Sequence, residues 1–120
     1  MTESAGRSNA SNSAAETSVS GLSDEFCEAV RAYAKSRNET MRVIYDEAIV
    51  AMEERVSGGE TIVFPAVAIG RPYKARHIRM SKTAKSALDG MGKHLNIHRS
   101  VIFHKAVRDY LESNGVDTPP

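Results

Sequence analysis

Four basic side chains lie within seven residues near the middle of the chain, in the stretch Lys74–Met80. The last residues of this stretch alternate in character: His77 and Arg79 would point to one side, and Ile78 and Met80 to the other. A period of two is typical of a β-strand that is buried on one face. Such a strand would display cationic groups on its open face, an arrangement suited to binding an anion.

Charge is distributed unevenly along the chain, although the net charge is only +1 at pH 7. Residues 71–115 carry ten Lys or Arg against three acidic residues, whereas residues 22–55 carry five against eight. Asymmetry of this kind suggests that one face meets a polyanion. Two ordinary solvated helical surfaces would give the same counts, so charge alone leaves both interpretations open.

The chain contains an internal repeat, which indicates the elements that would position these basic residues. A shift of 58 positions overlays Leu22–Glu54 on Met80–Glu112 without a gap, and apolar positions agree where identities do not. The identical pairs include Ser23 with Ser81, Ala29 with Ala87, Lys35 with Lys93 and Asn38 with Asn96. A repeat of this length indicates that one small structural unit occurs twice.

Each copy is predicted to contain two helices joined by a tight turn. Ser81 is a suitable N-cap for the first helix of copy two, and apolar residues follow it at helical spacing. Asn96 can adopt the left-handed conformation in which helices often end, and Asn38 is its counterpart in copy one. A strand before Ser23, over 17–22, is less convincing because it contains Gly21 and two serines.

Length and composition predict one compact domain with short tails. We expect flexible tails at 1–15 and 116–120 and a single domain over 16–115. Its two copies would span 16–57 and 73–115, joined by an extended linker at 58–72. The first 20 residues lack the features of a secretion signal, no apolar run is long enough for a membrane, and Cys27 is the only cysteine. We therefore expect a cytoplasmic protein that does not associate with a membrane and has neither a disulfide nor a cysteine-rich zinc site.

The order strand, helix, turn, helix resembles that of the ribbon-helix-helix DNA-binding proteins of the MetJ/Arc/CopG superfamily. Ile78-Arg79-Met80-Ser81 is similar to the family's strand and helix cap, and Asn96-Ile97-His98-Arg99-Ser100 to its inter-helix turn. Members pair two strands into a ribbon that enters the major groove. The resemblance implies a mainly α fold with a two-stranded antiparallel β-ribbon, here a tandem ribbon-helix-helix pseudo-dimer within one chain. Tandem members occur among conjugation accessory proteins and virulence-C enhancers of T-DNA transfer, which the layout resembles most.

This resemblance also implies which residues would meet DNA. On the ribbon, the base-facing positions would be Ala75, His77 and Arg79 in copy two and Thr17 and Val19 in copy one, while Lys74 and Arg76 would touch phosphate. The N-termini of the second helices would seat further phosphates through His98, Arg99 and Ser100, and through Thr40, Met41 and Arg42. A solvated strand and ordinary helix capping remain the alternatives for these two sets.

The function implied is that of a non-enzymatic, sequence-selective protein for double-stranded DNA, without cofactor or metal, monomeric as a pseudo-dimer and able to assemble further on DNA. It would be an accessory factor for plasmid conjugation or T-DNA transfer that helps to recruit a relaxase. A repressor or antitoxin of the same superfamily is one alternative, and a helical protein-interaction module that binds no DNA is another. His94 and His98 have a spacing that zinc ligands use, but Asn96 would end the helix between them and no third ligand is evident.

Overall fold

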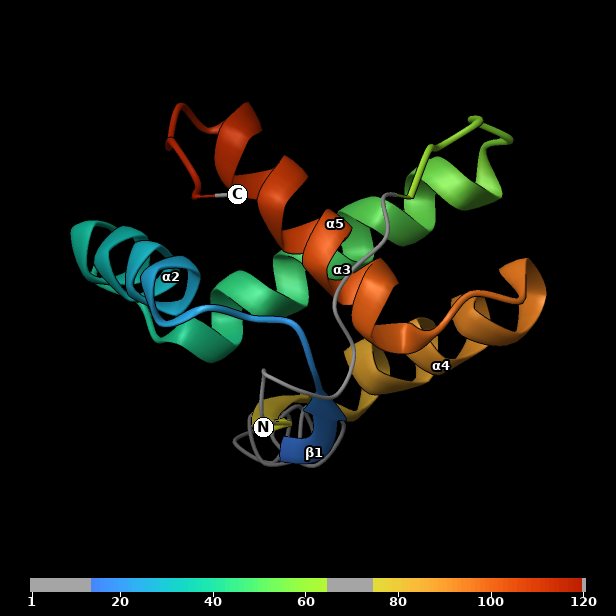
Figure 1. Cartoon of the computed structure of the whole chain (residues 1–120), viewed down its shortest axis with the longest axis horizontal. Coiled ribbons are helices and arrows are strands. Elements are labelled where there is room, and N and C mark those ends of the chain that lie inside the picture. The colour runs from blue at the N-terminus through green and yellow to red at the C-terminus, as the bar shows by residue number, and fades with distance from the viewer. Residues whose placement is uncertain (1–13, 65–74, 120) are drawn as a thin grey trace, which may run out of the picture.

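A computed structural model describes residues 14–64 and 75–119, and these residues form the sequence strand, helix, helix twice over. The first set comprises β1 (Ala14–Val19), α2 (Asp24–Ser36) and α3 (Met41–Ser57), and the second comprises β2 (Arg76–Ser81), α4 (Lys82–Leu95) and α5 (Arg99–Ser113) (Figure 1). The first helices begin 58 residues apart, at 24 and 82, and so do the second helices, at 41 and 99. No helix in the described ranges is both long and apolar enough to cross a membrane.

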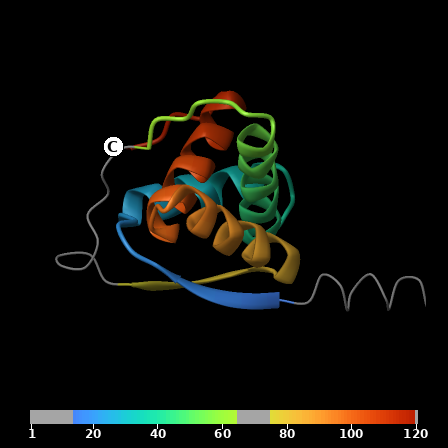
Figure 2. The same ribbon diagram turned by 90° about the vertical axis from the view of Figure 1, so that its right-hand side faces the viewer.

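The two strands form an antiparallel ribbon, which confirms the predicted mainly helical chain with two paired strands. Ala14 lies opposite Ser81 at one end of the ladder, and Val19 lies opposite Arg76 at the other. Figure 2 shows the strands side by side along one side of the helices. β1 begins inside the segment expected to be a tail, and β2 begins after Lys74, which lies outside the described residues.

Local interactions at the helix ends agree with the sequence. The hydroxyl of Ser81 accepts a hydrogen bond from the amide of Ala84 at 3.1 Å, and that of Ser23 accepts one from Phe26 at 3.0 Å. Asn38 and Asn96 follow the first helix of each copy with φ of 58° and 57°. The predicted left-handed turn after α4 is therefore confirmed, and Asn tolerates this conformation at low cost.

The core lies between the helices and the inner face of the ribbon, with α3 and α5 crossing at its centre and α2 and α4 on opposite sides (Figure 1). At the crossing the rings of Tyr45 and Phe103, which are equivalent in the 58-residue overlay, have centroids 5.2 Å apart. The largest buried side chains come from every helix and both strands. Because each half contributes to one cluster, neither half has a core of its own.

Parts of the predicted linker and C-terminal tail pack on this body. Ile62 and Phe64 are partly buried against the core, and residues 65–72 of the predicted linker lie outside the described ranges. Val116 also contacts the core, and a guanidinium nitrogen of Arg108 donates to the Pro119 carbonyl at 2.7 Å. Residues 116–119 therefore lie against α5.

One prediction about the ribbon is wrong: Thr17 and Val19 do not lie on its open face but are buried, with 7% and 0% exposure. The overlay equates Val19 with His77, yet the strands differ just beyond these positions. In β2 a single residue lies between the buried Ile78 and Met80, so the alternation stays regular up to the helix. After β1, two residues, Ser20 and Gly21, lie between the buried Val19 and the buried Leu22. Gly21 has a φ of 87° and takes up the additional residue, so the alternation of β1 is shifted by one position.

We expect Gly21→Ala to lower the free energy of unfolding by about 1–2 kcal/mol, because a Cβ disfavours the positive φ at this position. Chemical denaturation at pH 7 measures the change. Gly90→Ala is the matched control: Gly90 lies within α4, and no atom comes within 4 Å of the position of its Cβ, so this change should raise stability by about 0.5–1 kcal/mol. Equal effects of the two substitutions would contradict a special backbone role for Gly21.

A polar network ties α2 to α3 and α5. A guanidinium nitrogen of Arg37 donates to Glu47 at 3.0 Å and to the Tyr110 hydroxyl at 2.8 Å, and that hydroxyl also donates to Glu47. The hydrogen bond from Arg37, followed by that from Tyr110, lowers the pKa of Glu47 below its ordinary value of 4.5. A carboxylate whose pKa is lower in the folded state stabilises the fold above its unfolded pKa, and this contribution is lost as the pH falls through the folded value.

Glu47→Gln should therefore lower the free energy of unfolding by about 1 kcal/mol at pH 7, since the network then loses its charge on a half-exposed surface. The difference from the wild type should shrink as the pH falls through the lowered pKa of folded Glu47, below which the carboxyl group is protonated in both states. Urea denaturation at pH 7 and at a series of acidic pH values tests this. Glu53→Gln, at an exposed position on the same helix, should show no such pH-dependent difference.

Candidate nucleic-acid interface

The open face of the ribbon carries charged and polar side chains from both strands. Alternation places His77 and Arg79 of β2 on this face together with Glu16 and Ser18 of β1. In the antiparallel register Arg79 lies opposite Glu16, and His77 lies opposite Ser18. Side chains in directly opposite positions have Cβ atoms about 4.5–5.5 Å apart, so these four groups form one compact surface.

Arg79 is the guanidinium group on this surface. It is exposed, and no carboxylate of residues 14–64 or 75–119 lies within ion-pair distance of it. His77 and Ala75 are also exposed, in agreement with the faces predicted for them. A guanidinium group in this position can present two parallel N–H donors to an acceptor pair brought against the ribbon.

Beside the ribbon runs a groove of about 350 Å³ between β2, α2 and the start of α3. Arginines from three elements line it, together with the thiol of Cys27 and the ring of Tyr45. These arginines are Arg31, Arg42, Arg76 and Arg79. The groove therefore extends the cationic surface from the ribbon towards the N-terminus of α3.

Three of the four groove arginines already have carboxylate partners. Arg76 bonds to Asp24, which raises the pKa of the guanidinium, and its Nε also donates to the Leu22 carbonyl at 3.2 Å. Arg42 lies 4.0 Å from Asp46, and Arg31 pairs with Glu28. These pairs are partly or largely exposed, so solvent weakens them and an incoming anion can compete with the carboxylates.

The N-termini of the two second helices differ in their surroundings. Thr40 is exposed at the start of α3, and Met41 and Arg42 line the groove. At the start of α5, His98 is exposed and caps the helix by accepting a hydrogen bond from Ser100 N at 3.0 Å. The α3 end is thus the more open of the two predicted phosphate seats.

The residues that begin α5 hold β1 in place. Arg99 donates through Nε to the Ser18 carbonyl at 2.8 Å, and the Ser100 hydroxyl accepts from Ser20 N at 2.9 Å. Ser100 is 0% exposed, so the prediction that it contacts phosphate is wrong. Its physical role is to satisfy a backbone N–H where β1 leaves the ladder.

Cys27 and His104 are both buried. Burial raises the pKa of the Cys27 thiol, which disfavours the nucleophilic thiolate. Burial, followed by the charge of Arg108, lowers the pKa of His104, whose ring stacks on Phe26. Within the described ranges no three His, Cys, Asp or Glu side chains are grouped so that they could hold a metal ion.

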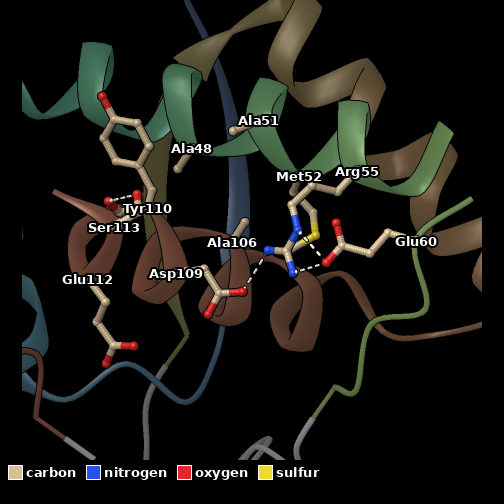
Figure 3. A pocket seen from close by; sticks show the side chains of 10 residues that line it. All are labelled: Ala48, Ala51, Met52, Arg55, Glu60, Ala106, Asp109, Tyr110, Glu112 and Ser113. Carbon is tan, nitrogen blue, oxygen red and sulfur yellow. Dashed lines mark hydrogen bonds and ion pairs between the residues drawn. The ribbon is translucent and has the colours of Figure 1, made fainter. Parts of the chain in front are cut away.

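A second cavity, of about 400 Å³, lies between the C-terminal halves of α3 and α5 (Figure 3). Its wall includes the small side chains Ala48, Ala51 and Ala106. Arg55 bridges Glu60 and Asp109 across it, at 2.7 and 2.8 Å. Because the three charged groups Arg55, Glu60 and Asp109 are already paired with one another, as Figure 3 shows, they offer less to a ligand than Arg79 on the ribbon does.

Sequence reasoning missed Glu16 and Ser18, which replace Thr17 and Val19 on the open face of β1. An isolated glycine in a strand pattern often marks a bulge, and Gly21 was the signal available for the shift. Comparisons with protein-family models, with curated proteins and with solved structures found no match to this chain.

Ser100→Ala should lower the free energy of unfolding by about 1–2 kcal/mol, because it leaves the partly buried N–H of Ser20 without its acceptor. Thermal or urea denaturation measures the loss. Ser86→Ala, at an exposed position on α4, is the matched control and should change stability little. A Ser100→Ala protein as stable as the control would show that the hydroxyl is not needed to hold β1.

Proposed function

We propose that this protein binds double-stranded DNA with sequence selectivity and places its β-ribbon in the major groove. The observation that carries the proposal is the exposed Arg79 on the open face of an antiparallel two-stranded ribbon. The major groove admits a two-stranded ribbon, and an arginine pairs bidentately with O6 and N7 of guanine. His77, next to it on the same face, supplies a further polar contact.

Phosphate contacts would come from the groove beside the ribbon. Arg42 and Arg31 lie on the α3 and α2 walls, and Thr40 caps the N-terminus of α3, which begins at Met41. A helix N-terminus and nearby arginines together favour a phosphate. These contacts would position the ribbon on the duplex without reading its sequence.

Several observations support a tandem ribbon-helix-helix pseudo-dimer. The equivalent rings of Tyr45 and Phe103 meet at the centre of the molecule, as residues near a two-fold axis would. Each strand is also held by the second helix of the other copy. Ser100 of α5 accepts from Ser20 just after β1, and Asp46 of α3 accepts from Ser81 N of β2 at 2.9 Å.

The biological context follows from the resemblance alone: an accessory factor in the cytoplasm that marks a site for plasmid conjugation or T-DNA transfer and recruits a relaxase. A footprint at a transfer origin or border would support this context, and one at the protein's own promoter would favour a repressor. The pairing of three groove arginines with carboxylates favours the remaining alternative, a module that binds only protein. A steep fall in duplex affinity with rising salt would separate DNA binding from that alternative.

We expect the wild-type protein to select a defined sequence from a randomised duplex library, and its affinity to fall steeply between about 50 and 200 mM salt as phosphate contacts are lost. Arg79→Ala should cost about 1–3 kcal/mol on the selected duplex and much less on random duplex, since it removes a base contact. Arg42→Ala should weaken binding to both duplexes alike. Fluorescence anisotropy with labelled duplexes measures all three proteins.

Arg42 is the suitable phosphate variant because the Arg99 side chain also bonds to β1, so that Arg99→Ala would disturb the ribbon itself. Equal losses on selected and random duplex for Arg79→Ala would remove Arg79 from base reading. A wild-type protein that binds no duplex even at low salt would overturn the proposed function.

A further inference from the structure

Glu16 occupies an unusual place for a carboxylate. It is exposed at the middle of the open ribbon face, directly opposite Arg79. Within the described part of the chain its carboxylate makes no hydrogen bond and no ion pair. By contrast, Asp24, Glu28 and Asp46 around the adjoining groove each pair with an arginine.

A carboxylate on this face opposes binding to DNA in general. It would repel the phosphates of any duplex, and it can make no favourable contact with a base edge that carries only acceptors. Guanine presents O6 and N7 in the major groove, and thymine presents O4, so Glu16 would discriminate against both. Groups that repel wrong partners contribute to specificity as much as groups that attract the right one.

The chemistry of the major groove identifies the base that suits Glu16. Cytosine presents the N4 amino group as a donor, and a Glu or Asp carboxylate is its usual acceptor. Opposite side chains on the two strands have Cβ atoms about 4.5–5.5 Å apart, while successive base pairs are about 3.4 Å apart. Glu16 and Arg79 can therefore contact the same base pair or neighbouring ones.

We propose that Glu16 is a specificity-determining residue that accepts a hydrogen bond from a cytosine N4 amino group beside the guanine bound by Arg79. The two side chains then form one reading unit across the ribbon, with an acceptor on β1 and a donor on β2. The target site contains a cytosine and a guanine in the same or adjacent base pairs under this unit. This inference rests on the proposed DNA-binding function.

Selection from a randomised duplex library with the full chain, comparing the wild type with Glu16→Gln, tests the proposal. Glutamine has nearly the same shape but pairs bidentately with adenine, so the preferred base at one position should change from cytosine to adenine. Replacing that cytosine in the wild-type site should weaken wild-type binding about tenfold and Glu16→Gln binding much less. Glu25→Gln, at an exposed position on α2 rather than on either strand of the ribbon, should keep the wild-type preference.

Two results would overturn the inference, and they are distinguishable from each other. If Glu16→Gln binds all duplexes more tightly but selects the same sequence, Glu16 acts only through its charge, and the proposed DNA-binding function stands. If the wild type selects no sequence, the proposed function and the inference fail together. Because Glu16 is exposed, thermal denaturation should show equal stability for the variant and the wild type, so a change in preference can be assigned to the side chain.

Discussion

Hydrogen bonding between β1 and β2 is the constraint on which the rest of the structure depends. The strands precede α2 and α4, so pairing them brings the beginnings of both helical units to one side of the molecule. A two-stranded ribbon is only marginally stable in water, and this one is held by packing its inner face against the helices. Val19, Ile78 and Met80 enter the same core as α3 and α5. Ribbon and core therefore require each other.

The distribution of charge around the ribbon bears on how it would recognise DNA. Three groove arginines pair with carboxylates, whereas neither Arg79 nor Glu16 on the open face forms an ion pair within the described ranges. Paired, exposed arginines attract phosphate less than free ones, which would keep affinity for arbitrary duplex low. Under the proposed function, discrimination would come from the two free side chains on the ribbon, one a donor and the other an acceptor.

Features that depend on nearby residues were predicted from the sequence, whereas features that depend on distant contacts were not. The caps Ser23 and Ser81 and the left-handed Asn38 and Asn96 were predicted because each acts on backbone within three or four residues. The exposure of His77 and Arg79 was predicted because the alternation of β2 is regular. Thr17 and Val19 were misplaced because the overlay assumed the same alternation in β1.

By itself, the sequence determined the repeat, the starts and ends of the helices, and the polar face of β2, since these depend on short-range spacing. Only the tertiary structure determined which side chains of β1 face the core and that Ser100 accepts a hydrogen bond from the end of this strand. The amide of Ser20 finds its acceptor 80 residues away, and Glu16 meets Arg79 only through the ladder. Spacing along one segment carries no information about which distant group will complete its hydrogen bonds, so the composition of the open ribbon face emerged only when both strands were paired.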